Sequence, residues 1–215
     1  IPIYASGWNL ISYPIPETRP VVTALQSISG TYSIVYGYEA TDTADPWKVY
    51  AVGEPEWVND LDNLVFGRGY WISATQSITL HLRGADYDSA DGSASAMPMV
   101  PTTYYGRVES GAGFTPVAGM TLTAWIDDHL CGRAVLTDVA GYGVAYAVNV
   151  MADDDGAYDG CGATGRDVVF RVNGQMMGPS ASWNSDQVWE VVLEPQHVLH
   201  LPLLMRSYAD VVNLA

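Results

Sequence analysis

The sequence predicts a mainly β protein of two small domains: a β-rich first domain with one or two short helices, and a second domain folded as an antiparallel sandwich. Short apolar runs recur between turn signals along the chain. Gly, Pro and Tyr are abundant, with 21, 12 and 14 copies in 215 residues, and this composition favours short strands joined by tight turns. No GxGxxG motif and no repeating unit of strand and helix is found, so a nucleotide-binding α/β fold is not expected.

Residues 1–83 are expected to form the first domain. The apolar patterns of GWNLISYPI, YSIVYGYEA and PWKVYAV predict strands, and GYWISATQSITLHL predicts a strand pair or one bent strand. The segment TRPVVTALQSISG lies between the first two strands, and its early Pro20, spaced apolar residues and closing Gly30 predict a short helix. A second helical turn is expected in EWVNDLDNLVFG.

Residues 84–101 are expected to be a linker, because they are rich in Gly, Ala, Ser, Asp and Pro and show no periodicity. Residues 102–194 are expected to form the second domain. Strands are predicted in YYGRVES, MTLTAWIDD, HLCGRAVLTD, YGVAYAVNVM, DVVFRVNGQ and VWEVVLE, with turn signals between them. Short strands at near-regular spacing favour an antiparallel sandwich.

Residues 195–215 form a strand-like tail in which apolar residues fall on alternate positions. Pro202 would confine this strand to the edge of a sheet. The tail either packs on its own chain or is donated to an open sheet edge of the next subunit. The face that would mediate such an assembly carries Leu199, Leu201, Leu203 and Met205.

Charge excludes several kinds of partner. The formal net charge is −15, and Lys48 is the only lysine. Phosphate binding needs clustered Lys and Arg, so binding to nucleic acid is not expected, and no apolar run is long enough for membrane insertion. The chain opens IPIYASGW without a methionine, so a processed N-terminus and an extracellular or cell-surface location are expected.

Two parts of the sequence resemble known domains. GWNLISYPI and the later GRGYWIS resemble a small domain of secreted bacterial proteins, which pairs a Gly-Trp-Asn-Leu strand with a Gly-x-Gly-Tyr-Trp-Ile strand. The stretch YYGRVES to DVVFRVNG, with TAWIDDHLCG inside it, is similar to Ig-like, prealbumin-like sandwiches of the collagen-adhesin B-type and carboxypeptidase regulatory-like families. This second resemblance implies a stalk, spacer, adhesion unit or carbohydrate binder at a cell surface.

The end of the chain carries a further resemblance. HLPLLMRSY is similar to a YLPLV-x-R segment at an end of many secreted proteins from filamentous thermophilic bacteria. This resemblance implies export.

Cys131 and Cys161 are the only cysteines and would close a loop of about thirty residues. In an extracellular chain we expect one disulfide, worth roughly 3–4 kcal/mol in the chain-entropy model. The alternative is a pair of reduced, buried thiols.

The segment MADDDGAYDGCGATGRD is the densest polar cluster. An EF-hand is excluded, because with Gly156 at its sixth position the first ligand would be Met151. An irregular calcium site remains, and the alternative is a solvated loop with Arg166 as a partial counter-charge. The side chains that would bind calcium are Asp153, Asp154, Asp155 and Asp159.

The chain has seven tryptophans, and some of them could form a flat platform for a carbohydrate, since aromatic rings stack on the faces of sugars. Trp47, Trp57 and Trp183 lie in or beside turn-rich segments, so these three are the candidates for exposed rings. The alternative is core packing. Core packing is the expectation for Trp8, Trp71 and Trp125.

No catalytic arrangement is found: the four histidines lack metal-ligand spacing, and no GxSxG motif occurs. The chain is therefore not expected to be an enzyme, and no cofactor is expected apart from the calcium alternative. The sequence predicts a non-catalytic extracellular structural or adhesive protein, in its boldest form a subunit that assembles with copies of itself into a surface filament or layer through terminal strands. The alternative is a carbohydrate-binding accessory module of a larger secreted protein, with glycans as partners.

Overall fold

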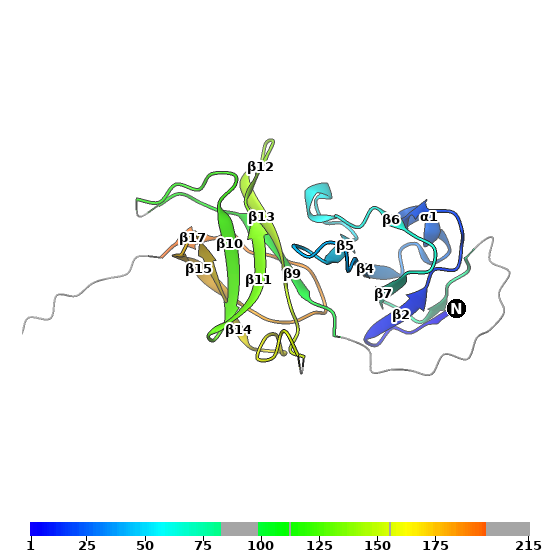
Figure 1. The fold of residues 1–215 in the computed structure, drawn as a ribbon. Helices are drawn as coiled ribbons and strands as arrows, with labels where there is room; N and C mark the ends of the chain where they lie inside the picture. The colour runs from blue at the N-terminus through cyan, green and yellow to red at the C-terminus, as the bar shows by residue number, and fades with distance from the viewer. Residues whose placement is uncertain (83–98, 112, 155, 197–215) are drawn as a thin grey trace, which may run out of the picture.

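A computed structural model describes residues 1–82, 99–111, 113–154 and 156–196 (Figure 1). The described chain is mainly β and mostly antiparallel, which confirms the predicted fold class. Its strands form two groups, which we call the N-terminal part (residues 1–82) and the C-terminal part (residues 99–196). No helix of the described residues is both long and apolar enough to cross a membrane.

The N-terminal part is organised around a four-stranded sheet of order β2-β7-β4-β5. Two short pairs, β1 with β8 and β3 with β6, flank this sheet. Its elements are β1 (Pro2–Ile3), β2 (Trp8–Ser12), β3 (Arg19–Pro20), α1 (Val21–Ala24), η1 (Gln26–Ile28), β4 (Tyr32–Tyr38), β5 (Trp47–Ala51), η2 (Glu56–Val58), β6 (Asn63–Leu64), β7 (Gly69–Ala74) and β8 (Ile78–Thr79).

The central strands of this sheet bury both of their faces. Successive side chains of a strand point to opposite faces, and Val35 of β4 and Ile72 of β7 pack in one cluster with residues of α1 and η1. Tyr36 and Trp71 point the other way and belong to a different buried cluster. The predicted short helix forms directly after Pro20, and the second predicted helical turn is η2.

The C-terminal part is a sandwich of two sheets, with orders β11-β10-β14-β15-β17 and β12-β13-β9-β16. Inward side chains of both sheets, such as Leu122, Phe170, Tyr104 and Val148, share one core. Its strands are β9 (Thr102–Arg107), β10 (Thr121–Ile126), β11 (His129–Val135), β12 (Thr137–Val139), β13 (Gly143–Val150), β14 (Asp167–Val172), β15 (Gln175–Ser182), β16 (Trp189–Glu190) and β17 (Glu194–Pro195).

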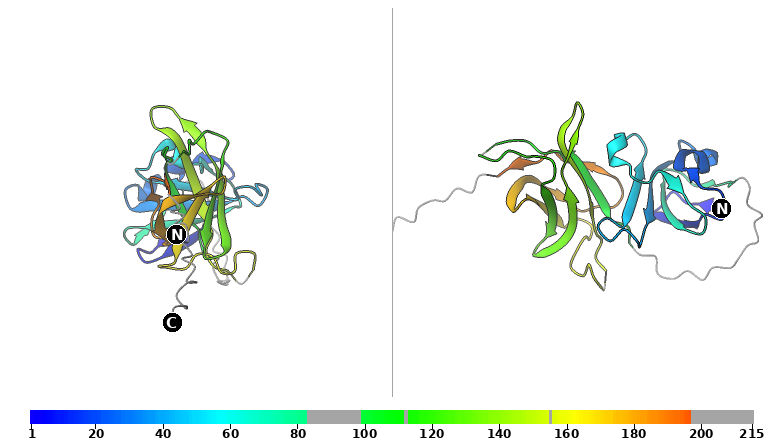
Figure 2. Two further views of the ribbon diagram at one scale, coloured as in Figure 1. Left: turned by 90° about the vertical axis from the view of Figure 1, so that its left-hand side faces the viewer. Right: turned by 45° about the horizontal axis from the view of Figure 1, so that its top comes forward.

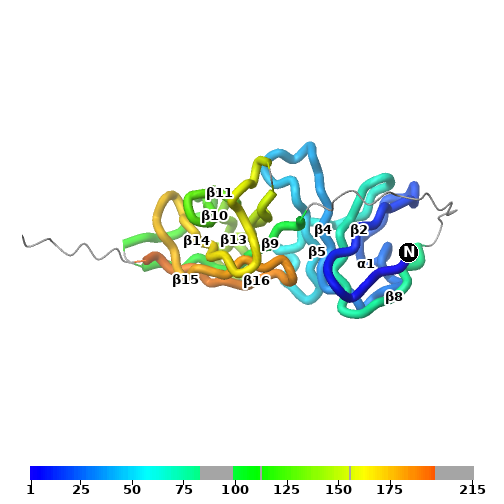
Figure 3. Tube along the Cα trace, turned by 90° about the horizontal axis from the view of Figure 1, so that it is seen from below, coloured from blue at the N-terminus to red at the C-terminus, as the bar shows by residue number. Residues whose placement is uncertain are grey.

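The two parts lie end to end, with β4 and β5 of the N-terminal part facing β9 of the C-terminal part (Figures 2 and 3). Every strand pairing among the described residues joins two strands of the same part. A buried apolar cluster nevertheless spans the junction, with Tyr36, Trp47 and Trp71 on one side and Tyr105 and Met151 on the other. The division into two domains therefore stays a prediction, because the parts share buried surface.

Two predicted segments fall largely on residues that the structure does not describe. Residues 83–98 make up most of the predicted linker. Residues 197–215 contain the predicted assembly face, so Leu199, Leu201, Leu203 and Met205 lie outside the described residues.

Candidate functional site

A cavity of about 320 Å³ opens at the junction, within the size range of small-molecule sites. Its walls come from strands of the N-terminal part, from Met99 before β9, and from the loop that follows β13 in the C-terminal part. The lining residues are Tyr38, Trp47, Trp71, Met99, Met151, Ala152, Asp153, Asp154 and Tyr158. We call this cavity the junction pocket.

Three aromatic rings from neighbouring strands form one wall of the junction pocket. Tyr38 lies opposite Trp47 in the pairing of β4 with β5, and their ring centroids are 5.2 Å apart. The rings of Trp47 and Trp71 are 5.0 Å apart. Tyr38 is 47% exposed, whereas Trp47 and Trp71 are 7% and 8% exposed. Tyr38 therefore offers the accessible ring, and the two indoles lie behind it.

The indole N–H of Trp71 is buried and has no hydrogen-bond partner among the described residues. An unpaired buried donor is unfavourable by roughly 1–3 kcal/mol, and most buried polar groups in proteins find a partner. Trp71 also lines the junction pocket. The sequence assigned Trp71 to core packing and gave no sign of the unpaired N–H.

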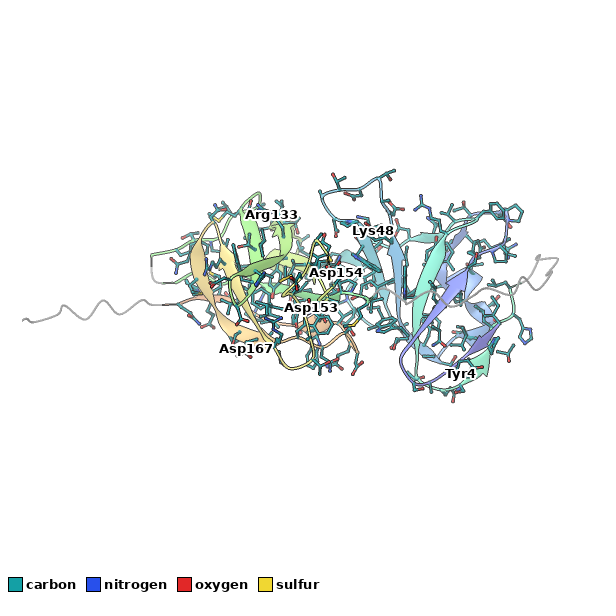
Figure 4. The ribbon with its side chains drawn as sticks, turned by 60° about the horizontal axis from the view of Figure 1, so that its bottom comes forward. Tyr4, Lys48, Arg133, Asp153, Asp154 and Asp167 are labelled. Atoms are coloured by element: carbon teal, nitrogen blue, oxygen red, sulfur yellow. A yellow bond between two sulfur atoms is a disulfide. The ribbon has the colours of Figure 1, made fainter. Side chains whose placement is uncertain are left out.

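The acidic loop contributes Asp153, Asp154 and Tyr158 to the lining of the junction pocket, and Figure 4 labels the two aspartates. Oδ1 of Asp154 accepts hydrogen bonds from the backbone N–H groups of Gly156 and Tyr158, at 3.0 and 2.8 Å. Oδ1 of Asp153 accepts one from the N–H of Gly160 at 2.9 Å. One oxygen of each carboxylate therefore shapes the loop, and no described residue donates to the other oxygen.

The predicted disulfide between Cys131 and Cys161 is present, with a Cα–Cα distance of 5.5 Å. It ties β11 to the end of the acidic loop. At the base of the loop, the N–H of Asp153 donates to the carbonyl of Gly162 at 2.7 Å. The loop that carries the acidic side of the pocket is thus fastened at its base.

The calcium site is not supported by the arrangement of the described acids. No group of three or more His, Cys, Asp or Glu in the described parts of the chain could hold a metal ion, and Asp155 lies outside them. Asp159 is exposed. The guanidinium of Arg166 pairs with Asp127 at 2.7 Å and donates to the carbonyl of Cys161 at 2.7 Å.

Two of the tryptophans expected to be exposed are buried. Trp183 is 1% exposed, and its Nε1–H donates to the carbonyl of Val150 at 3.0 Å. The indole fits because Gly162 has no side chain: a Cβ there would lie 2.1 Å from Nε1 of Trp183. Trp47 is also buried, because its ring packs against Tyr38 and Trp71, although it belongs to the lining of the junction pocket.

Trp57 and Trp125 differ from their expectations in other ways. Trp57 is half-buried at the junction and packs against Tyr105 and Tyr142, with ring centroids 5.5 and 5.2 Å away. It does not line the junction pocket. Trp125 lies outside the core of the sandwich, half-buried under the guanidinium of Arg171, which is 5.0 Å above its ring. The structure therefore does not bring the three candidate tryptophans together.

Asn149 of β13 connects the two parts through a buried hydrogen-bond network. Its Nδ2 donates to the carbonyl of Trp47 at 2.8 Å and to Oδ1 of Asp45 at 3.0 Å. Its Oδ1 accepts from the hydroxyl of Thr103 at 2.6 Å, and that hydroxyl bonds Tyr36 at 2.7 Å. Burial raises the pKa of Tyr36 above its usual value, so this hydroxyl stays protonated and neutral.

Lys48 holds a cluster of three carboxylates beside this network, at 2.9 Å from Asp42, 3.4 Å from Asp60 and 3.6 Å from Asp45. Partial burial alone would lower the pKa of Lys48, but the hydrogen bond to Asp42 and the charges of Asp45 and Asp60 together raise it. Burial raises the pKa of Asp60 to about 6, against the hydrogen bond from Val49 and the charge of Lys48. Lys48 therefore stays protonated and offsets part of the repulsion among these acids.

A second cavity of about 270 Å³ adjoins the junction pocket and shares Met151 and Tyr158 with it. Its lining includes Asp45, Arg133 and Asn149. The two cavities therefore adjoin at these two residues.

Searches against family models, curated proteins and solved structures returned no match for this chain. The function is therefore argued from the geometry of the junction pocket.

Proposed function

We propose that this chain is a non-catalytic extracellular adhesive protein that binds a carbohydrate in the junction pocket. The observation that carries this proposal is the composition of the pocket, which combines aromatic rings, an unpaired indole N–H and carboxylate oxygens. Small-molecule sites are typically aromatic and apolar, with a few polar groups that fix the orientation of the ligand. A sugar has matching surfaces, because its C–H faces are apolar and its hydroxyls both donate and accept.

Each feature of the pocket has a role in this proposal. The exposed ring of Tyr38 supports the apolar face of a sugar, as aromatic rings do for other flat apolar surfaces. The N–H of Trp71 donates to a hydroxyl or ring oxygen. Hydroxyls of the sugar donate to the carboxylates of Asp153 and Asp154, and hydrogen bonds to charged acceptors are the stronger ones. The disulfide supports the extracellular setting, since such bonds persist in oxidising compartments.

Two substitutions test the pocket separately from the fold. Tyr38→Ala removes the exposed ring, and we expect affinity for the bound glycan to fall roughly five- to tenfold, as for an aromatic contact of about 1 kcal/mol. Trp71→Phe keeps a ring and removes the N–H, so affinity should fall by a similar factor while thermal stability is unchanged or higher, because a buried unpaired donor is lost. A glycan array would identify the ligand, and calorimetry would measure its affinity.

Tyr4→Ala is the matched control, because Tyr4 is another exposed tyrosine and lies on the N-terminal part away from the junction (Figure 4). Its affinity should equal that of the unmodified protein. An array on which no glycan binds, or a Tyr38→Ala variant that binds as well as the control, would contradict the proposal.

We propose self-assembly through a terminal strand as a second function, which an open sheet edge supports. β15 runs over eight residues, but it pairs with β17 only through Met177 and Gly178. On that side, residues 179–182 have no neighbouring strand among the described residues. An unpaired edge of this kind accepts an added strand, and the alternating tail at 197–215 has the pattern of one.

Deleting residues 196–215 is expected to abolish filaments or layers, because it removes the donated strand. Electron micrographs of the secreted protein with and without these residues would show the result. Leu201→Asp should have the same effect because it charges the predicted assembly face, whereas His200→Asp on the opposite face should leave assembly intact. Unchanged assembly after the deletion would refute strand exchange.

A further inference from the structure

The charged groups that line the junction pocket are all acidic. Asp153 and Asp154 are the only ionisable acids in the lining, and no Lys, Arg or His accompanies them among the described residues. The nearest cation in sequence, Arg166, is paired with Asp127. Two carboxylates side by side repel each other unless a positive charge is nearby. The pocket therefore favours a ligand that brings a cation.

The aromatic wall favours a cation for an independent reason. The face of an aromatic ring is negative, and an ammonium group within about 6 Å of a Trp or Tyr centroid gains roughly 0.5–2 kcal/mol. Tyr38, Trp47 and Trp71 lie in one wall, with neighbouring centroids 5.0 and 5.2 Å apart. An ammonium group in this pocket would therefore lie against the exposed ring of Tyr38, with both carboxylates in the lining of the same cavity.

The unpaired N–H of Trp71 favours a ligand that offers more than an ammonium group. An ammonium group has no lone pair to accept a hydrogen bond, so it would leave this buried donor unsatisfied. A hydroxyl or ring oxygen would satisfy it. A ligand that presents both a cation and an oxygen acceptor therefore complements more of these groups than an ammonium ion does.

We infer that the carbohydrate bound in the junction pocket is an amino sugar with a free, protonated amino group, such as a unit of a glucosamine oligomer. This inference rests on the proposed function and names the class of its ligand. The ammonium lies against the carboxylates of Asp153 and Asp154, and a hydroxyl or ring oxygen accepts from Trp71.

Three oligosaccharides of equal length and linkage test this inference by calorimetry: β1→4 tetramers of glucosamine, N-acetylglucosamine and glucose. At pH 6 the glucosamine tetramer should bind at least tenfold more tightly than the other two. The preference should shrink as the pH rises through the pKa of the ligand's amine, because the ammonium loses its charge. It should also shrink at high salt, which screens charges near the surface.

Asp153→Asn and Asp154→Asn separate charge from loop structure. Each asparagine keeps the Oδ1 acceptor that holds the loop and removes one negative charge. Each variant should lose at least threefold in affinity for the glucosamine tetramer while binding the glucose tetramer within twofold of the unmodified protein. Asp138→Asn is the control, because it makes the same charge change in β12, at the other end of the sandwich (Figure 1).

The outcomes distinguish this inference from the proposed function. If the neutral tetramers bind as tightly as glucosamine, and the asparagine variants do not alter the ratio, the amino-sugar inference fails and carbohydrate binding stands. If choline binds while none of the tetramers and no glycan on the array does, both fail. Selective glucosamine binding that the two variants abolish and the control keeps would establish the inference.

Discussion

Replacing Cys131 and Cys161 with alanine is expected to lower the free energy of unfolding by roughly 3–4 kcal/mol in the chain-entropy model. The bond joins residues 30 apart in sequence, so its loss frees a long loop in the unfolded chain. Both side chains are buried, and alanine fills most of their space without adding a polar group. Urea unfolding at pH 7 measures the loss, and a shift of roughly 10 °C in the melting temperature should accompany it.

The same change is expected to weaken ligand binding, because the freed loop carries Asp153, Asp154 and Tyr158. Reduction of the unmodified protein with a thiol should reproduce both effects, whereas the thiol should not change the double-alanine variant. Equal unfolding midpoints for the two proteins would mean that the bond does not stabilise the native state.

The disulfide and the fold class could be predicted because each depends on a simple property of the chain. Two cysteines allow only one intrachain pairing, and alternating apolar residues between turns lead to short strands. The strand β15 was missed because QMMGPSAS contains Gly178 and Pro179 and lacks β-branched residues. β15 forms because it pairs with β14, and not because its own residues have a high β propensity.

The junction pocket could not be predicted, because its walls come from segments far apart in the sequence. The alternation of apolar residues correctly indicated that Trp71 is buried. Both faces of the central sheet are covered, so this alternation could not show which face of the sheet meets a cavity. Trp183 was misjudged for another reason. Its burial depends on the missing side chain of Gly162, which no local pattern reveals.

Asn149→Ala is expected to lower the free energy of unfolding by roughly 2–4 kcal/mol, since buried groups that lose their partner cost about 1–3 kcal/mol each. The carbonyl of Trp47 would lose the partner that holds it. The N–H of Glu39 donates to the carbonyl of Pro46, so the next pair along the ladder, Tyr38 with Trp47, is a non-hydrogen-bonded pair. The carbonyl of Trp47 therefore points away from β4. The hydroxyl of Thr103 would lose its acceptor as well.

A double-mutant cycle with Thr103→Val tests whether these groups act as one network. Thr103→Val removes the hydroxyl that joins Tyr36 to Asn149, so the two losses should be non-additive by at least about 0.5 kcal/mol. Asn184→Ala is the matched control, because Asn184 accepts one bond from the nearby N–H of Asp186 and lies outside the network. Its loss should stay below about 1 kcal/mol, as for a partly exposed hydrogen bond.

The decisive measurement is the affinity of the Asn149→Ala variant for the saccharide, under conditions in which the variant remains folded. Tyr38, Trp47 and Trp71 belong to one part, and Asp153, Asp154 and Tyr158 belong to the other. Asn149 does not line the junction pocket, but loosening its contact with Trp47 should weaken saccharide binding, and Asn184→Ala should leave binding unchanged. Additive losses below about 1 kcal/mol with unaltered binding would contradict a pocket that depends on this junction.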